Sequence, residues 1–168
     1  RALVDSHKAL PVVRASRAEL ASRDFVPFAA LAGMPAAMSA HVTFEAIDSE
    51  RPASLSPVVT QDVISDEIGF GGLLMSDVIS MGALSGSVGV GALNVLEAGS
   101  DVVLHCNGNH AEMREVAAQT PVLAGMALAR YERCVEIVAG EAMGVPARVF
   151  EAALALVSGD DGAGARDA

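Results

Sequence analysis

The segment Gly69-Phe-Gly-Gly-Leu-Leu-Met-Ser-Asp77 says more about the fold of this chain than any other stretch. Its apolar run from Leu73 to Met75 is typical of a buried strand, and the run stops at a serine and a carboxylate. A carboxylate placed directly after a buried run costs free energy to remove from water. We therefore expect Asp77 to have a chemical purpose.

Strand and helix signals alternate on both sides of this segment. Short apolar stretches predict two further strands, over residues 35–41 and 101–106. Helix signals separate these strands: a capping box at Ser16 and Glu19, a turn that restarts near Asp24 and Pro27, a start at Ser56-Pro57 with an end at Gly69, a helix ending near Gly99, a start at Asn109 with Glu112, and helices over about 127–138 and 146–156.

This alternation predicts an α/β fold built from βαβ units, whose strands pair in parallel and are buried on both faces. In such folds the ligand site lies at the carboxyl ends of the strands. The three predicted strands end at His41, at Asp77 and at the run from His105 to Asn107. We expect these residues at one rim, where the alternative is that the histidines are ordinary polar residues entering loops.

The composition excludes several classes of protein. The 168 residues suffice for one domain with a core, and no apolar run approaches the roughly 18 residues that a membrane span needs. The net charge of −10 argues against a nucleic-acid partner, because phosphate binding needs a basic surface. Cys106 and Cys134 do not suggest a disulfide framework. No signal peptide is visible, which favours a cytoplasmic location, and the start at Arg1 suggests part of a longer product.

Two other kinds of site compete with the strand-end carboxylate. Gly89 and Gly91 suggest a nucleotide loop, but Asn94 stands where the third glycine of that fingerprint belongs. His105, Cys106 and His110 are close enough to suggest a metal, yet their spacing is not typical of zinc sites. We therefore expect neither a cofactor nor a metal.

A further candidate lies near the start of the chain, where Asp5 and His7 are two residues apart. A carboxylate beside an imidazole orients it and raises its affinity for a proton, as a general acid near neutral pH requires. A solvated loop explains the same pair equally well.

Several segments of the chain resemble the glycoside hydrolase family 3 β-N-acetylglucosaminidases that act in bacterial peptidoglycan recycling. The resemblance extends from Asp5 to about Val138 and rests on the segments DSHKALP, MPAAMSAHV, ERPASLSPVV, IGFGGLLMSDVISMGAL, EAGSDVVLHCNG and AEMREVAA. It implies a (β/α)8 barrel and a retaining double displacement. It also implies a substrate with terminal β-linked N-acetylglucosamine, such as a muropeptide or an oligosaccharide.

The resemblance assigns roles to three residues. Asp77 aligns with the family's nucleophile, His7 with its histidine acid/base, and Asp5 with the aspartate that pairs with that histidine. Most retaining glycosidases use two carboxyl groups about 5 Å apart for these two jobs. A histidine does not repel an incoming anion, so both hydrolysis and transfer of the sugar to phosphate stay open.

The chain also departs from the family pattern. Family members commonly have aspartate where Gly71 and Val78 stand, and a sugar-binding motif precedes the region of Asp5 and His7. This chain starts after that motif, so we expect only about strands six to eight of the barrel, in residues 1–158, followed by a disordered tail over 159–168. The missing amino-terminal barrel half is then a possible partner.

Two alternatives follow from these departures. One is a truncated, catalytically inactive remnant or a weak carbohydrate-binding module. The other is an unrelated, doubly wound α/β binding protein.

Overall fold

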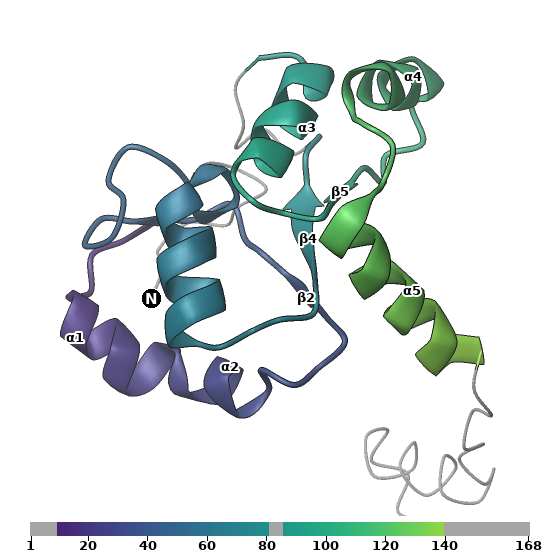
Figure 1. Ribbon diagram of the computed structural model, residues 1–168. Helices are drawn as coiled ribbons and strands as arrows, with labels where there is room; N and C mark the ends of the chain where they lie inside the picture. The colour runs from purple at the N-terminus through teal and green to yellow at the C-terminus, as the bar shows by residue number, and fades with distance from the viewer. Residues whose placement is uncertain (1–9, 81–85, 140–168) are drawn as a thin grey trace, which may run out of the picture. The chain divides into compact units, whose positions relative to one another are not determined.

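The computed structural model describes residues 10–80 and 86–139, shown as a ribbon in Figure 1. Apart from the end of the last helix, these residues belong to one compact unit, Arg1–Cys134. The elements are β1 (Val12–Val13), α1 (Arg17–Glu19), the π-type helix η1 (Leu20–Asp24), α2 (Val26–Ala30), β2 (Ala36–Met38), β3 (Thr43–Phe44), the 3-10 turn η2 (Ala53–Leu55), the π-type helix η3 (Val59–Glu67), β4 (Leu73–Val78), α3 (Val88–Glu97), β5 (Val102–Leu104), α4 (His110–Gln119) and α5 (Gly125–Ala139).

A three-stranded parallel sheet in the order β2-β4-β5 confirms the predicted α/β fold with parallel strands. Ala36 lies opposite Leu73 at the start of the β2–β4 pair, and Met38 lies opposite Met75 at its end. On the other side of β4, Met75 lies opposite Val102 and Val78 opposite Leu104, with an irregularity between the two positions. The central strand is thus β4, the segment that carries Asp77.

The strands differ in length from the predicted ranges. β4 runs one residue past Asp77, so the carboxylate lies within the strand and not after it. β2 and β5 are shorter than the predicted ranges 35–41 and 101–106, and beyond their ends the side chains of His41 and His105 bond to Ser54 and Glu112. The sequence did not predict the second, two-stranded parallel sheet of β1 and β3.

Helices cover the sheet, and their predicted caps are present. Ser16 and Glu19 form the capping box, with the Ser16 amide donating to Glu19 Oε2 at 3.0 Å. The Ser56 hydroxyl oxygen accepts the Val59 amide at the start of η3, and Gly69 follows this helix with a φ of 78°. Asn109 caps α4 through the Ala111 amide. The predicted helix over 146–156 and the domain boundary at 158 lie outside the described residues.

The glycines at the start of β4 show how close the backbones approach. A Cβ built on Gly72 would lie 2.6 Å from the Pro35 carbonyl oxygen and 2.7 Å from that of Met34, whereas a Cβ on Gly71 would meet open space. Gly72 is therefore required for β4 to lie against the chain that leads into β2.

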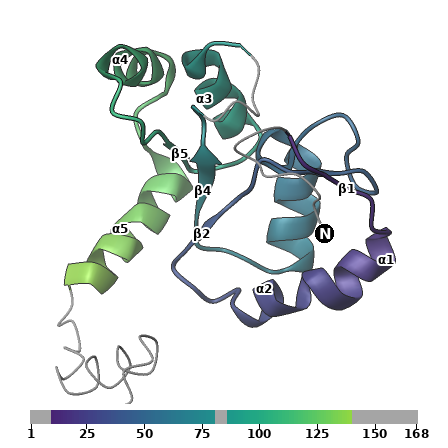
Figure 2. The same cartoon turned by 180° about the vertical axis from the view of Figure 1, so that it is seen from behind.

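Two clusters of buried apolar side chains hold the layers together. Val13, Leu20, Phe25 and Val63 pack between the first helices and η3. Ile79, Ala92 and Val95 pack between the end of β4 and α3. Helices α3 and α4 lie side by side in both views (Figures 1 and 2). Over the described ranges, we find no helix with the length and apolar character to cross a membrane.

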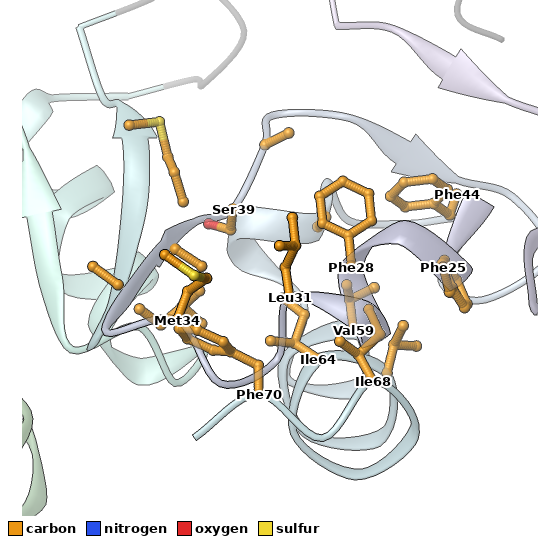
Figure 3. A pocket seen from close by; sticks show the side chains of 17 residues that line it. Phe25, Phe28, Leu31, Met34, Ser39, Phe44, Val59, Ile64, Ile68 and Phe70 are labelled. Atoms are coloured by element: carbon orange, nitrogen blue, oxygen red, sulfur yellow. The ribbon is translucent and has the colours of Figure 1, made fainter. Parts of the chain in front are cut away.

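An apolar cavity of about 380 Å³ lies beside β2 (Figure 3). Phe28 and Leu31 line it from the region of α2, Ile64 from η3, and the consecutive residues 36–40 from β2 and its extension. A strand exposes consecutive residues in this way along an edge, and among the described strands β2 pairs with β4 alone. Its described lining includes no titratable side chain, and the hydroxyl of Ser39 donates to the Met75 carbonyl oxygen at 3.4 Å.

Candidate active site

The carboxyl ends of the three parallel strands lie together, as predicted. The imidazole of His41, after β2, lies 3.2 Å from the Val78 carbonyl oxygen at the end of β4. The Ile79 amide, just past β4, donates to the Leu104 carbonyl oxygen at the end of β5 at 3.0 Å. This edge is where parallel α/β folds bind ligands.

Asp77 is half-buried at this edge. Its Oδ1 accepts the amide proton of the following residue, Val78, at 2.8 Å. No cation pairs with the carboxylate anywhere in the described part of the chain. A partly exposed carboxylate that is oriented by one backbone donor and not neutralised by a cation suits nucleophilic attack on an electrophilic carbon.

Ser76, which the sequence reasoning missed, fastens the backbone next to Asp77. Its side chain is fully buried, and its hydroxyl donates to the Asp77 carbonyl oxygen at 2.7 Å. The same hydroxyl oxygen accepts the Leu104 amide at 3.2 Å, which joins β4 to β5. The one sequence signal that could have indicated this role is that the apolar run of β4 stops at a serine.

His41 follows the alternative given for the strand-end histidines, because its side chain is bonded within the protein. The residue is fully buried, and its Nδ1 lies 2.6 Å from the Ser54 hydroxyl oxygen. Because both ring nitrogens have protein partners, the imidazole is not available to a substrate.

His105 is bonded to α4 through one of its ring nitrogens. Its side chain is 6% exposed, and Nε2 lies 2.8 Å from Oε2 of Glu112 on α4. Asn107 donates to the same oxygen at 2.7 Å, and Asn109 donates to Oε1 at 2.9 Å. The hydrogen bond from His105, followed by that from Asn107, lowers the pKa of the Glu112 carboxyl below its ordinary value. The Glu112 carboxylate thus bonds to three side chains along the segment that connects β5 to α4.

Gly89 and His105, which belong to the two competing sites that the sequence argued against, have structural roles. Gly89 lies inside α3, where its amide donates to Glu115 on α4 and an added Cβ would lie 2.9 Å from the Glu115 side chain. It serves helix packing, not a phosphate loop. His105 is committed to Glu112, and no group of three potential metal ligands lies together in residues 10–80 and 86–139. Asp5 and His7 lie outside the described residues.

Comparisons with known proteins bear directly on this edge. The model of the glycosyl hydrolase family 3 N terminal domain matches residues 1–136, which include Asp5, His7 and Asp77. The chain belongs to glycosyl hydrolase family 3. The match covers all three candidate catalytic residues, although it does not by itself assign their roles.

Relatives of this family 3 chain include named enzymes. The β-hexosaminidase of Chromobacterium violaceum is 40% identical over 124 residues, which is 70% of the chain and 34% of that enzyme. NagZ from Neisseria gonorrhoeae, solved with N-trifluoroacetyl-D-glucosamine, is 30% identical with a TM-score of 0.69 over 92% of the chain and 45% of NagZ. A family 3 β-N-acetylglucosaminidase from Paenibacillus sp. is 29% identical with a TM-score of 0.67 over 84% of the chain and 30% of that protein. The chain thus spans about a third of the length of the Chromobacterium enzyme.

Proposed function

We propose that this chain forms the catalytic edge of a retaining β-N-acetylhexosaminidase that removes terminal β-linked N-acetylglucosamine. The observation that carries the proposal is Asp77, a half-buried carboxylate at the carboxyl end of the central parallel strand of a family 3 chain. Similarity to enzymes named β-hexosaminidase, and to NagZ solved with an N-acylated glucosamine, supports the sugar. Similarity to these enzymes favours a hydrolase over an inactive remnant.

The proposed reaction has two steps. In the first, an oxygen of Asp77 attacks the anomeric carbon while the bond to the leaving group breaks, and His7, charged and oriented by Asp5, gives its proton to the departing oxygen. In the second, neutral His7 takes a proton from water, and the water oxygen displaces Asp77 from the sugar. Two inversions at one carbon retain its configuration.

The proposed architecture is a (β/α)8 barrel in which β2, β4 and β5 are strands six to eight. The cavity beside β2 supports it, because an apolar space along an unpaired strand edge fits a further strand with apolar side chains. We further propose peptidoglycan fragments as the substrate class and the cytoplasm as the location, both from the resemblance to the recycling enzymes.

The test uses a completed chain, meaning the 168 residues joined to the part of the Chromobacterium violaceum relative that lies outside the match. Asp77→Ala should lower turnover of an aryl N-acetylglucosaminide by several orders of magnitude, because the covalent step is lost. Asp62→Ala, on the exposed face of η3, is the matched control and should leave turnover unchanged. Near-normal turnover of Asp77→Ala would remove Asp77 from the mechanism.

Covalent labelling gives a second readout. A fluorinated N-acetylglucosaminyl donor with a good leaving group forms the glycosyl-enzyme but releases it slowly. Mass spectrometry of peptides from the completed chain should then place the added sugar on Asp77. A label on another residue would move the nucleophile elsewhere.

A further inference from the structure

The end of β4 is not held by a regular ladder. β2 ends at Met38, so its pairing with β4 stops at Met75, and the pairing with β5 is irregular between Met75 and Val78. Asp77 lies within this irregular part. Towards β5, the Ser76 hydroxyl of β4 accepts the Leu104 amide and the Ile79 amide donates to the Leu104 carbonyl oxygen.

On the β2 side, the link is His41. Its Nε2 faces the Val78 carbonyl oxygen at 3.2 Å, and a carbonyl oxygen can only accept, so Nε2 carries the proton and donates. Nδ1 is then an acceptor, and it accepts a hydrogen bond from the Ser54 hydroxyl, with 2.6 Å between the two atoms. Full burial of both side chains leaves the ring one orientation.

Val78 links His41 to Asp77 through its two backbone polar groups. The Val78 amide donates to Asp77 Oδ1 at 2.8 Å, while the Val78 carbonyl accepts from His41. The same residue is thus fixed at its carbonyl and orients the carboxylate with its amide. The carbonyl belongs to the Val78–Ile79 peptide and the amide to the Asp77–Val78 peptide, so the two are joined through the Val78 Cα. Without the bond from His41, the Val78–Ile79 peptide is held only by its Ile79 amide, and Val78 could turn and shift the amide that orients the carboxylate.

We propose that His41 is a positioning residue for the nucleophile: it touches no substrate, but it holds the carbonyl of Val78, the residue whose amide orients the Asp77 carboxylate. The proposal rests on the proposed function of Asp77. Since displacement of a reacting group by about 1 Å can cost about 100-fold in rate, loss of this anchor should lower kcat more than it changes KM.

Two substitutions of His41 separate the effect of its hydrogen bond to Val78 from the effect of losing the volume of the ring. A glutamine amide nitrogen reaches about as far as imidazole Nε2, so His41→Gln can still donate to the Val78 carbonyl. An asparagine amide reaches only about as far as Nδ1, so His41→Asn can bond Ser54 but not Val78. In the completed chain we expect His41→Asn to lose about 10- to 100-fold in kcat with KM within about threefold, and His41→Gln to recover most of that loss.

The outcomes distinguish this proposal from a merely structural role. Wild-type kcat in a folded His41→Asn protein, or equal losses in both variants in proportion to their loss of thermal stability, would overturn the positioning role. If His41→Asn does not fold, Ser54→Ala is the variant to measure, because it removes the bond to Nδ1 and lets the ring tilt but keeps the imidazole. A lower kcat of Ser54→Ala at constant KM supports the positioning role. An unchanged kcat overturns it. If the completed chain without any substitution shows no turnover, that result counts against the proposed function itself.

Discussion

Asp101 and Arg130 form an ion pair in which Arg130 Nη1 lies 2.9 Å from Oδ1 and 3.1 Å from Oδ2 of Asp101. The Asp101 side chain is 7% exposed, and Oδ2 also accepts the Leu74 amide of β4 at 2.8 Å. One carboxylate therefore connects the start of β5, the central strand and α5.

We expect Asp101→Asn to destabilise the fold by about 2–3 kcal/mol, because it leaves a guanidinium that is partly buried without its counter-charge. The exposed pair of Arg14 and Glu45 offers a matched control, and Glu45→Gln should cost less than about 0.5 kcal/mol. Urea unfolding of the wild type and the two variants measures both effects. Equal midpoints for Asp101→Asn and Glu45→Gln would contradict the structural role of the ion pair.

Adjacent glycines at the start of β4 allow a sharp comparison. Gly72→Ala should destabilise the fold by about 1–3 kcal/mol, since the new methyl group would overlap two carbonyl oxygens that cannot easily move. Gly71→Ala adds the same methyl group into open space and should lie within about 0.5 kcal/mol of the wild type. Thermal unfolding checks both. If the two variants lose equal stability, the close approach of Gly72 to Pro35 is not what limits this position.

Glu112 should make stability depend on pH on the acid side. Its pKa is lowered in the folded state, chiefly by the hydrogen bond from His105, so its charged form stabilises the fold above the unfolded pKa. That contribution is lost as pH falls through the lowered folded pKa. We expect the melting temperature of Glu112→Gln to lie below that of the wild type at about pH 6 and to converge with it towards about pH 3.

The exposed Glu97 of α3 provides the control for this measurement. Glu97→Gln also removes one exposed carboxylate, so it shows what the loss of a surface charge does to the melting temperature by itself. A gap between Glu112→Gln and the wild type that stays constant over the same pH range would show that ionisation of Glu112 does not contribute.

The proposed acid, His7, can be tested through the leaving group. His7→Ala should slow cleavage of a sugar aglycone far more than cleavage of a nitrophenyl aglycone, because nitrophenolate departs with little protonation. The ratio of kcat/KM values for the two substrates in wild type and variant, each in the completed chain, measures this difference. Equal losses on both substrates would assign the acid to another group.

We expect the 168-residue chain by itself to show no measurable glycosidase activity. It spans about a third of the length of the Chromobacterium enzyme, and among the described strands β2 and β5 each have one neighbour. A sugar needs contacts on several sides to reach a near-attack geometry. The assay compares this chain with the completed chain on an aryl N-acetylglucosaminide, and robust turnover by the shorter protein would prove this expectation wrong.

Local signals in the sequence predicted local structure well. The capping box of Ser16, the cap at Asn109 and the glycine after η3 depend on residues a few positions apart, and the structure confirms them. The parallel order of the sheet followed from the alternation of elements. Asp77 stood out because a charged group next to a buried run is unusual.

Contacts across the fold could not be predicted in the same way. The bonds from His41 to Val78 and from Ser76 to Leu104 join different strands, and they depend on strand register and on the irregularity in β4. The strands β1 and β3 have two residues each, too few to show an alternating pattern. For His41 and His105 the sequence left two interpretations open, because it shows where a strand ends but not which way the next side chain turns.

The apolar cavity beside β2 has a consequence for how the protein behaves in concentrated solution. Phe28, Leu31 and Met34 are each more than half exposed there, next to β2, which among the described strands pairs with β4 alone. Such a surface accepts almost any extended apolar segment, including one from a neighbouring chain. Handling this protein at high concentration, or heating it, should therefore promote aggregation that begins at this groove, and a charged residue at position 31 should delay it.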